Sequence, residues 1–124
     1  MKKAIATEKA PGAIGPYSQG IETEHFIYTS GQLGINPETK EFASTIEEQT
    51  KQALENVKVI LEEAGSSMEK VVKTTVFLKN MDDFAAMNGV YAQFFQGVCP
   101  ARSAFQVAKL PLDGMVEIEV VATK

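Results

Sequence analysis

Residues 45–78 read TIEEQTKQALENVKVILEEAGSSMEKVVKTTVFL, and this stretch decides the fold of the chain. Thr45 and Glu48 form a capping box that marks a helix start, and Gly65 suits the left-handed position that follows a helix. Between them one apolar stripe recurs at helical spacing, with most charged residues off it: Ile46, Ala53, Leu54, Val57, Ile60, Leu61 and Ala64. The β-forming run Val71–Leu78 then predicts a strand soon after this amphipathic helix.

A second helix and further strands are predicted on either side of this unit. Asn80 or the acidic residues after it can cap the helix, whose apolar stripe is Phe84, Met87, Tyr91, Phe94 and Phe95. Strands are expected at Phe26–Ser30, Ala101–Val107 and Val116–Thr123, with an earlier strand or hairpin arm around Ile5 and Gly20–Thr23. Because Pro111 and Gly114 separate the last two strands, these two are predicted to form an antiparallel pair.

This order of elements predicts a sheet with two helices packed on one face, because right-handed crossovers place both helices on the same side. The other face of the sheet is not clearly polar, since Val121 lies beside Glu117 and Glu119 on the outer side of the last strand. An apolar sheet face requires a covering layer, which a second copy of the chain supplies most simply. We therefore expect a homo-oligomer.

Length and charge restrict the class of protein. The chain has 124 residues, which predicts one domain over 1–124, and its net charge of −4 argues against binding to nucleic acid. The lone Cys99 requires no oxidising compartment, and no segment approaches the roughly 20 apolar residues of a membrane span. We expect a cytoplasmic protein with neither a membrane nor a nucleic-acid partner.

The sequence lacks the residues that several kinds of catalytic centre require. His25 is the only histidine, and its position between Glu24 and Phe26 favours a solvated turn over a catalytic triad. No histidine or lysine lies near Cys99 in the sequence to activate it as a nucleophile, so it is interpreted as an incidental thiol. The sequence contains no Cys/His cluster for zinc and no glycine-rich phosphate loop. Neither a metal nor an organic cofactor is expected.

Two stretches in the first third of the chain are unusual for a protein without a site. Residues 13–20 place Tyr17 directly after a Gly-Pro turn. Residues 29–32 end a strand with Ser30 and Gly31, where the glycine permits close approach to the backbone. Each stretch also fits a purely structural interpretation, as an anchored turn and as a β-bulge.

A third stretch, residues 100–105, places Arg102 in a strand among small or apolar neighbours. By alternation Arg102 and Ala104 share a face, and a partly buried guanidinium fits a carboxylate bidentately. Two interpretations are open. Spacing alone favours a structural ion pair of Arg102 with Glu117 or Glu119. In the other interpretation, Arg102 binds the carboxylate of a substrate, and Glu117 transfers a proton or positions a water molecule.

Taken together, these stretches resemble the RidA family of enamine/imine deaminases, also called the YjgF family, over essentially the full length of the chain. The strongest match is Pro100-Ala101-Arg102-Ser103. The other matching runs, in order, are residues 13–20, 29–32, 56–57, 72–77, Asn88 with Tyr91, 110–111 and 116–119.

The resemblance implies a chorismate-mutase-like α+β fold with a mixed sheet, assembled as a homotrimer with its sites at the subunit interfaces. It implies hydrolysis of reactive 2-imino acids to 2-keto acids and ammonia. These imines are tautomers of enamines, such as 2-aminoacrylate and 2-aminocrotonate, that pyridoxal-phosphate enzymes release. It also implies that Arg102 binds the substrate carboxylate with help from the main chain of Ala104, that Glu117 positions or activates the water, and that the pocket is lined by Tyr17, Ser30, Gly31 and Asn88.

Two departures from the family pattern bear on the pocket. Many relatives carry Cys or Thr where this chain has Ala104, and Gly34 replaces a proline that is common there. Both are expected to affect substrate preference more than reaction type. The alternatives are a member without catalysis that binds small carboxylates or regulates a partner, and, less favoured, RNA cleavage or inhibition of translation.

Overall fold

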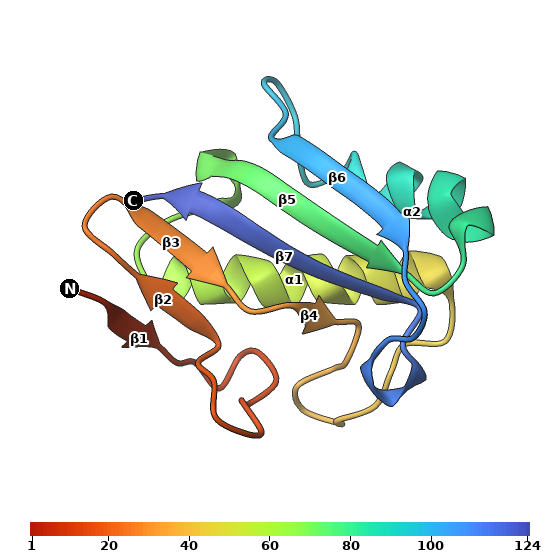
Figure 1. Ribbon diagram of the computed structural model, residues 1–124, viewed down its shortest axis with the longest axis horizontal. Coiled ribbons are helices and arrows are strands. Elements are labelled where there is room, and N and C mark those ends of the chain that lie inside the picture. The colour runs from red at the N-terminus through yellow and green to blue at the C-terminus, as the bar shows by residue number, and fades with distance from the viewer.

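The computed structural model describes residues 1–124 and contains one mixed sheet with two α-helices behind it (Figure 1). The helices are α1 (Ile46–Glu63) and α2 (Phe84–Tyr91). The strands are β1 (Lys3–Ile5), β2 (Gly20–Glu22), β3 (Phe26–Thr29), β4 (Gln32–Leu33), β5 (Val71–Leu78), β6 (Ala101–Gln106) and β7 (Val116–Thr123). Short 3₁₀ turns occupy Met68–Lys70, Met81–Asp83 and Pro111–Asp113.

The strands lie in the order β1-β2-β3-β7-β5-β6, and β4 pairs with β7. Only β5 and β6 run parallel, and every other pair is antiparallel, which confirms the predicted mixed sheet. The α1 crossover leads from β4 to β5 and the α2 crossover from β5 to β6. Both helices lie on the same face, as expected from two crossovers of one hand (Figure 1).

The predicted antiparallel pairing of the last two strands is wrong. β6 pairs only with β5, while β7 lies between β3 and β5 near the middle of the sheet. Burial explains why β7 and not β6 takes the central position. β7 carries four buried apolar residues on its helix-facing side: Val116, Ile118, Val120 and Ala122. No residue of β6 is fully buried, so an edge position leaves less apolar surface exposed.

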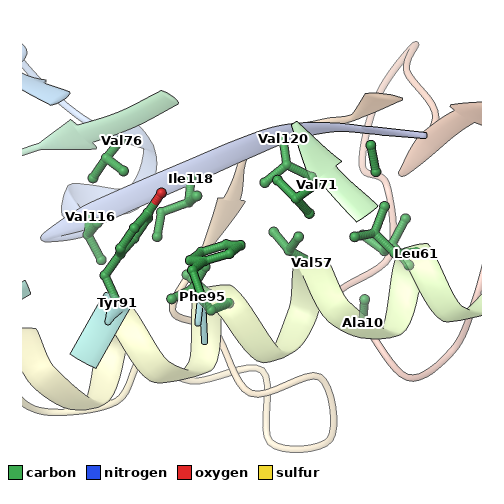
Figure 2. Packing of buried hydrophobic residues seen from close by; sticks show 14 of the residues in the cluster. Ala10, Val57, Leu61, Val71, Val76, Tyr91, Phe95, Val116, Ile118 and Val120 are labelled. Atoms are coloured by element: carbon green, nitrogen blue, oxygen red, sulfur yellow. The ribbon is translucent and has the colours of Figure 1, made fainter. Parts of the chain in front are cut away.

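The core forms between the sheet and the predicted stripe of α1. Val57 and Leu61 point up from α1 towards the sheet, and Val120 of β7 lies above Val57 (Figure 2). Tyr91 and Phe95 complete this part of the core beneath Ile118 of β7 (Figure 2). The helix begins as predicted, since the Thr45 Oγ1 accepts a hydrogen bond from the Glu48 N–H at 3.1 Å. It ends before Gly65, whose φ of 80° is the left-handed conformation expected there.

The second helix is shorter than its apolar stripe. α2 ends at Tyr91, and the next bonds, such as Phe94 N–H to the Tyr91 carbonyl, span three residues instead of four. Phe95 is nevertheless buried in the core. The stripe therefore predicted burial correctly and helix length incorrectly, because a tightened turn still points Phe95 inward.

No helix covers the other face of the sheet. Glu117, Glu119 and Val121 lie on this open face, which confirms the alternation expected for β7. Tyr28 and Phe105 also lie here, and each is 45% exposed. Neither helix of the chain has the length and apolar character that a membrane crossing requires.

Candidate functional site

A cleft of about 770 Å³ lies where the loop before β2, the β3–β4 junction and the turn at residues 111–112 meet. Four of the predicted site residues line it: Tyr17, Ser30, Gly31 and Glu117. The structure thus brings together residues from three distant parts of the sequence, as the family resemblance implied.

The loop that carries Tyr17 is fixed by a buried glutamine. The Gln19 amide donates to the carbonyls of Thr7 and Pro11 at 3.0 and 2.7 Å and accepts from the Thr7 N–H at 2.7 Å. Ser30 completes the attachment, because its Oγ donates to the Ser18 carbonyl at 2.6 Å. Tyr17 itself stays 52% exposed at the cleft wall, so its ring can contact a ligand.

Glu117 projects into the cleft from the open face of β7. Its carboxylate is half-buried and forms neither an ion pair nor a hydrogen bond with another side chain. Burial raises the pKa of Glu117 above its ordinary value, and the neighbouring charge of Glu119 raises this pKa further. Such an acid exchanges protons more readily near neutral pH than a solvated glutamate does.

Gly31 is the residue that lets Glu117 occupy this position. A Cβ placed on Gly31 would lie 2.7 Å from the Glu117 Cδ, closer than side-chain packing allows. The expectation that Gly31 permits close approach to the backbone is therefore confirmed, and the approaching group is the Glu117 side chain.

Arg102 lies in a second cluster, between β6 and α2. Its Nη1 donates to the Asn88 Oδ1 at 2.6 Å. Its Cζ lies 4.8 Å from the centre of the Tyr91 ring and 5.3 Å from that of Phe84. Burial is the main cause that raises the pKa of the Tyr91 hydroxyl, which hydrogen-bonds Thr74. The phenol therefore stays neutral beside the guanidinium.

The interpretation of Arg102 as the partner of Glu117 or Glu119 in a structural ion pair is wrong. None of the ion pairs in the chain includes Arg102, Glu117 or Glu119. Arg102 pairs in register with Thr74 on the helix-facing side, whereas Glu117 pairs with Phe77 on the open face. The sheet itself therefore separates the guanidinium from the carboxylate within one chain.

The remaining candidate residues lie either beside Arg102 or outside both clusters. Ala104 is partly buried beside the core on the face of Arg102, as alternation predicted. Asn88 contacts Arg102 and does not line the cleft around Glu117. Cys99 is exposed, and His25 is an exposed residue 3.8 Å from Glu24. No three His, Cys, Asp or Glu side chains gather closely enough to hold a metal ion.

Two residues of the Arg102 cluster were not identified from the sequence as part of a site. Phe84 and Tyr91 fit the apolar stripe of a helix, and that pattern predicts core packing. The match of Asn88 with Tyr91 to the family pattern was the available signal, but only the parallel β5–β6 pairing places Arg102 beside α2.

The chain is similar to known proteins over essentially its whole length. Residues 7–124 match the family described as endoribonuclease L-PSP. A RutC family protein of Pyrococcus abyssi is 52% identical over 124 residues, covering 99% of this chain and 98% of that protein. The 2-iminobutanoate/2-iminopropanoate deaminase of Escherichia coli strain K12 is 48% identical over 127 residues, covering 100% of this chain and 99% of that enzyme.

Solved structures agree with the sequence comparison. The crystal structure of Escherichia coli TdcF with bound serine superimposes with a TM-score of 0.95 at 46% identity, covering 98% of each chain. A match of this extent in both sequence and structure shows common ancestry as well as a common fold. The chain therefore belongs to the endoribonuclease L-PSP family, the family of the RidA/YjgF proteins.

Proposed function

We propose that this protein hydrolyses 2-imino acids to 2-keto acids and ammonia, at sites that two subunits of a homotrimer build together. Arg102 binds the substrate carboxylate, with the main chain of Ala104 as a further donor, and Glu117 positions or activates the attacking water. Tyr17, Ser30 and Gly31 form the wall of the pocket, and Asn88 orients Arg102. The substrates are tautomers of enamines such as 2-aminoacrylate and 2-aminocrotonate.

The observation that carries this proposal is the unpaired charge of Arg102. A partly buried guanidinium ordinarily pairs with a carboxylate, yet its only side-chain hydrogen bond here goes to a neutral amide. Its planar fork has five N–H donors, and one of them reaches Asn88. The remaining donors suit the carboxylate of a small acid, which they can hold bidentately.

The carboxylate of Glu117 supplies the complementary chemistry. It accepts a proton from a water molecule as the water oxygen forms a bond to the imine carbon. The Glu117 carboxyl then gives this proton to the imine nitrogen, which yields a tetrahedral aminoalcohol. The regenerated carboxylate next takes the hydroxyl proton and passes it to the amino nitrogen as the C–N bond breaks, so that ammonia leaves, the keto group forms and Glu117 is ionised again. General acid–base catalysis of this kind typically contributes about 10²–10⁴-fold.

The opposite placement of the two groups supports a site between subunits. Within one chain the sheet separates Arg102 from Glu117. The open face carries exposed Tyr28 and Phe105, which an adjacent subunit would cover. A closed ring of three subunits repeats one such contact and so completes every site identically.

The relatives support the same reaction class. The 48% identical relative is named as a deaminase of 2-iminobutanoate and 2-iminopropanoate. The similar crystal structure of TdcF contains bound serine, a small molecule with a carboxylate. Both descriptions agree with a guanidinium that recognises a small acid, and they favour this reaction over RNA cleavage by a chain of net charge −4.

A coupled assay tests the proposal. Threonine dehydratase releases the imine in solution, and the formation of 2-ketobutyrate is followed with and without this protein. Wild type should accelerate the reaction, whereas Arg102→Ala should lose at least about 10²-fold, because both orientation and charge are removed. Arg102→Lys should also fail substantially, since an ammonium does not reproduce the fork. If neither wild type nor variant accelerates ketobutyrate formation, a noncatalytic binder of small carboxylates becomes the better interpretation.

A further inference from the structure

Three side chains of α2 surround the Arg102 guanidinium from one side of that helix. Phe84, Asn88 and Tyr91 are four and then three positions apart, so their side chains form one row on the helix surface. Asn88 contacts Nη1 through its amide oxygen, and the two rings contact the guanidinium through their π systems. The row therefore touches the cation at three points and occupies one N–H donor.

The Tyr91 ring is itself held in place from the sheet. Its hydroxyl forms a buried hydrogen bond of 2.8 Å with Thr74 Oγ1, and its ring lies 4.6 Å from the centre of the Phe95 ring. Thr74 is the register partner of Arg102 on β5. Rotation of the Tyr91 ring away from Arg102 would thus break a buried hydrogen bond, which is costly to leave unmade.

We infer that Phe84 and Tyr91 are positioning residues for carboxylate recognition, which fix the orientation of the Arg102 guanidinium without neutralising it. The inference rests on the proposed function, because it assumes that Arg102 binds a carboxylate. An acidic neighbour would orient the cation equally well but would occupy the donors that the substrate requires. An aromatic face attracts the cation through its quadrupole and accepts no N–H bond in the guanidinium plane. The two rings therefore order the Arg102 guanidinium and leave its remaining N–H donors available to the substrate carboxylate.

Substitutions at Phe84 test the role of the rings. Phe84→Leu keeps an apolar side chain and removes the aromatic face, and it should raise KM about 3- to 30-fold while kcat changes by less than about twofold. Phe84→Tyr restores the face and should return KM to near the wild-type value. Met87→Ala is the matched control, because it removes a buried side chain of α2 that forms neither a hydrogen bond nor a cation–π contact with Arg102. It should lower Tm and leave KM unchanged.

The hydroxyl pair offers an independent test. Tyr91→Phe and Thr74→Val each remove one partner of the buried hydrogen bond, and each should raise KM about 2- to 10-fold. If the bond acts by holding the ring, the double variant should be no worse than the poorer single variant. Additive losses would instead mean that the two residues act separately.

Calorimetric titration with 2-ketobutyrate separates this inference from the proposed reaction, because binding of the keto acid requires Arg102 and no turnover. Weaker binding to Phe84→Leu, restored in Phe84→Tyr, would support the positioning role even if wild type failed to deaminate any imine. Unchanged Kd and KM in a correctly assembled Phe84→Leu variant would overturn it. Failure of wild type to bind 2-ketobutyrate would also overturn it, because Arg102 would then have no carboxylate to receive.

Discussion

Glu117 combines partial burial with a like charge on its own strand. Burial is the larger cause of its raised pKa, and Glu119 is the second. As a general base Glu117 works only when ionised, so kcat/KM should fall as pH drops below this pKa. Glu119→Gln removes the neighbouring charge, which lowers the pKa of Glu117 and should shift the acidic limb to lower pH.

The measurement is the pH profile of kcat/KM for wild type and Glu119→Gln between about pH 4 and pH 8. This range covers the pH at which a glutamate with a raised pKa loses its proton. Glu62→Gln is a suitable control, because Glu62 is an exposed residue of α1. An acidic limb that stays in place in Glu119→Gln, or moves to higher pH, would remove Glu117 from the role of base.

Gly31 makes a separate prediction at the same scale. In Gly31→Ala the new Cβ meets Glu117 Cδ at 2.7 Å, so the carboxyl must move from its place in the cleft. A displacement of about 1 Å in a catalytic group can cost around 10²-fold, and we expect a loss of that order in kcat with a normal fold by circular dichroism. Gly12→Ala at the same cleft meets nothing within 4 Å and should retain activity. Equal activity in both variants would contradict the close-approach explanation.

Among the elements, α1, β5 and β7 follow most directly from the sequence. The periodicity of α1 and the alternation of β7 were sufficient because each element buries one complete face. The pairing of β6 was not predictable in the same way. A turn containing Pro111 and Gly114 suits a hairpin, but the α2 crossover places β6 outside β5 and leaves the central position to β7. Pairing is decided by burial across the whole sheet, which local spacing does not contain.

The start of α1 gives a prediction at the scale of the element. Thr45→Ala removes the side-chain acceptor of the Glu48 N–H and should lower the free energy of unfolding by about 1 kcal/mol. Thr45→Ser keeps the hydroxyl and should cost much less. Chemical denaturation of both variants compares the two values under the same conditions. Activity per folded molecule should stay near wild type, because Thr45 lies outside the cleft.

At the scale of the whole molecule, the candidate site residues form two clusters. Sequence motifs placed Tyr17, Ser30, Gly31 and Glu117 in one pocket, and the cleft contains all four. The motifs gave Arg102 and Asn88 as members of the same pocket, yet in a single chain they occupy the other face of the sheet. The spacing of these motifs does not indicate that their residues lie on two faces of the sheet, because that depends on how the strands pair.

Mixing two inactive variants tests the shared site directly. Arg102→Ala subunits keep Glu117, and Glu117→Gln subunits keep Arg102, so neither homotrimer should be active. In trimers reassembled at random from equal amounts, about a quarter of the interfaces combine an intact Arg102 with an intact Glu117. We therefore expect the mixture, after unfolding and joint refolding, to recover up to about a quarter of wild-type activity. A mixture with no activity, from trimers verified by sedimentation, would place both residues of each site in one chain. That result would require β6 to move relative to the rest of the sheet, because in the present arrangement Arg102 and Glu117 lie on opposite faces, with β5 between their strands.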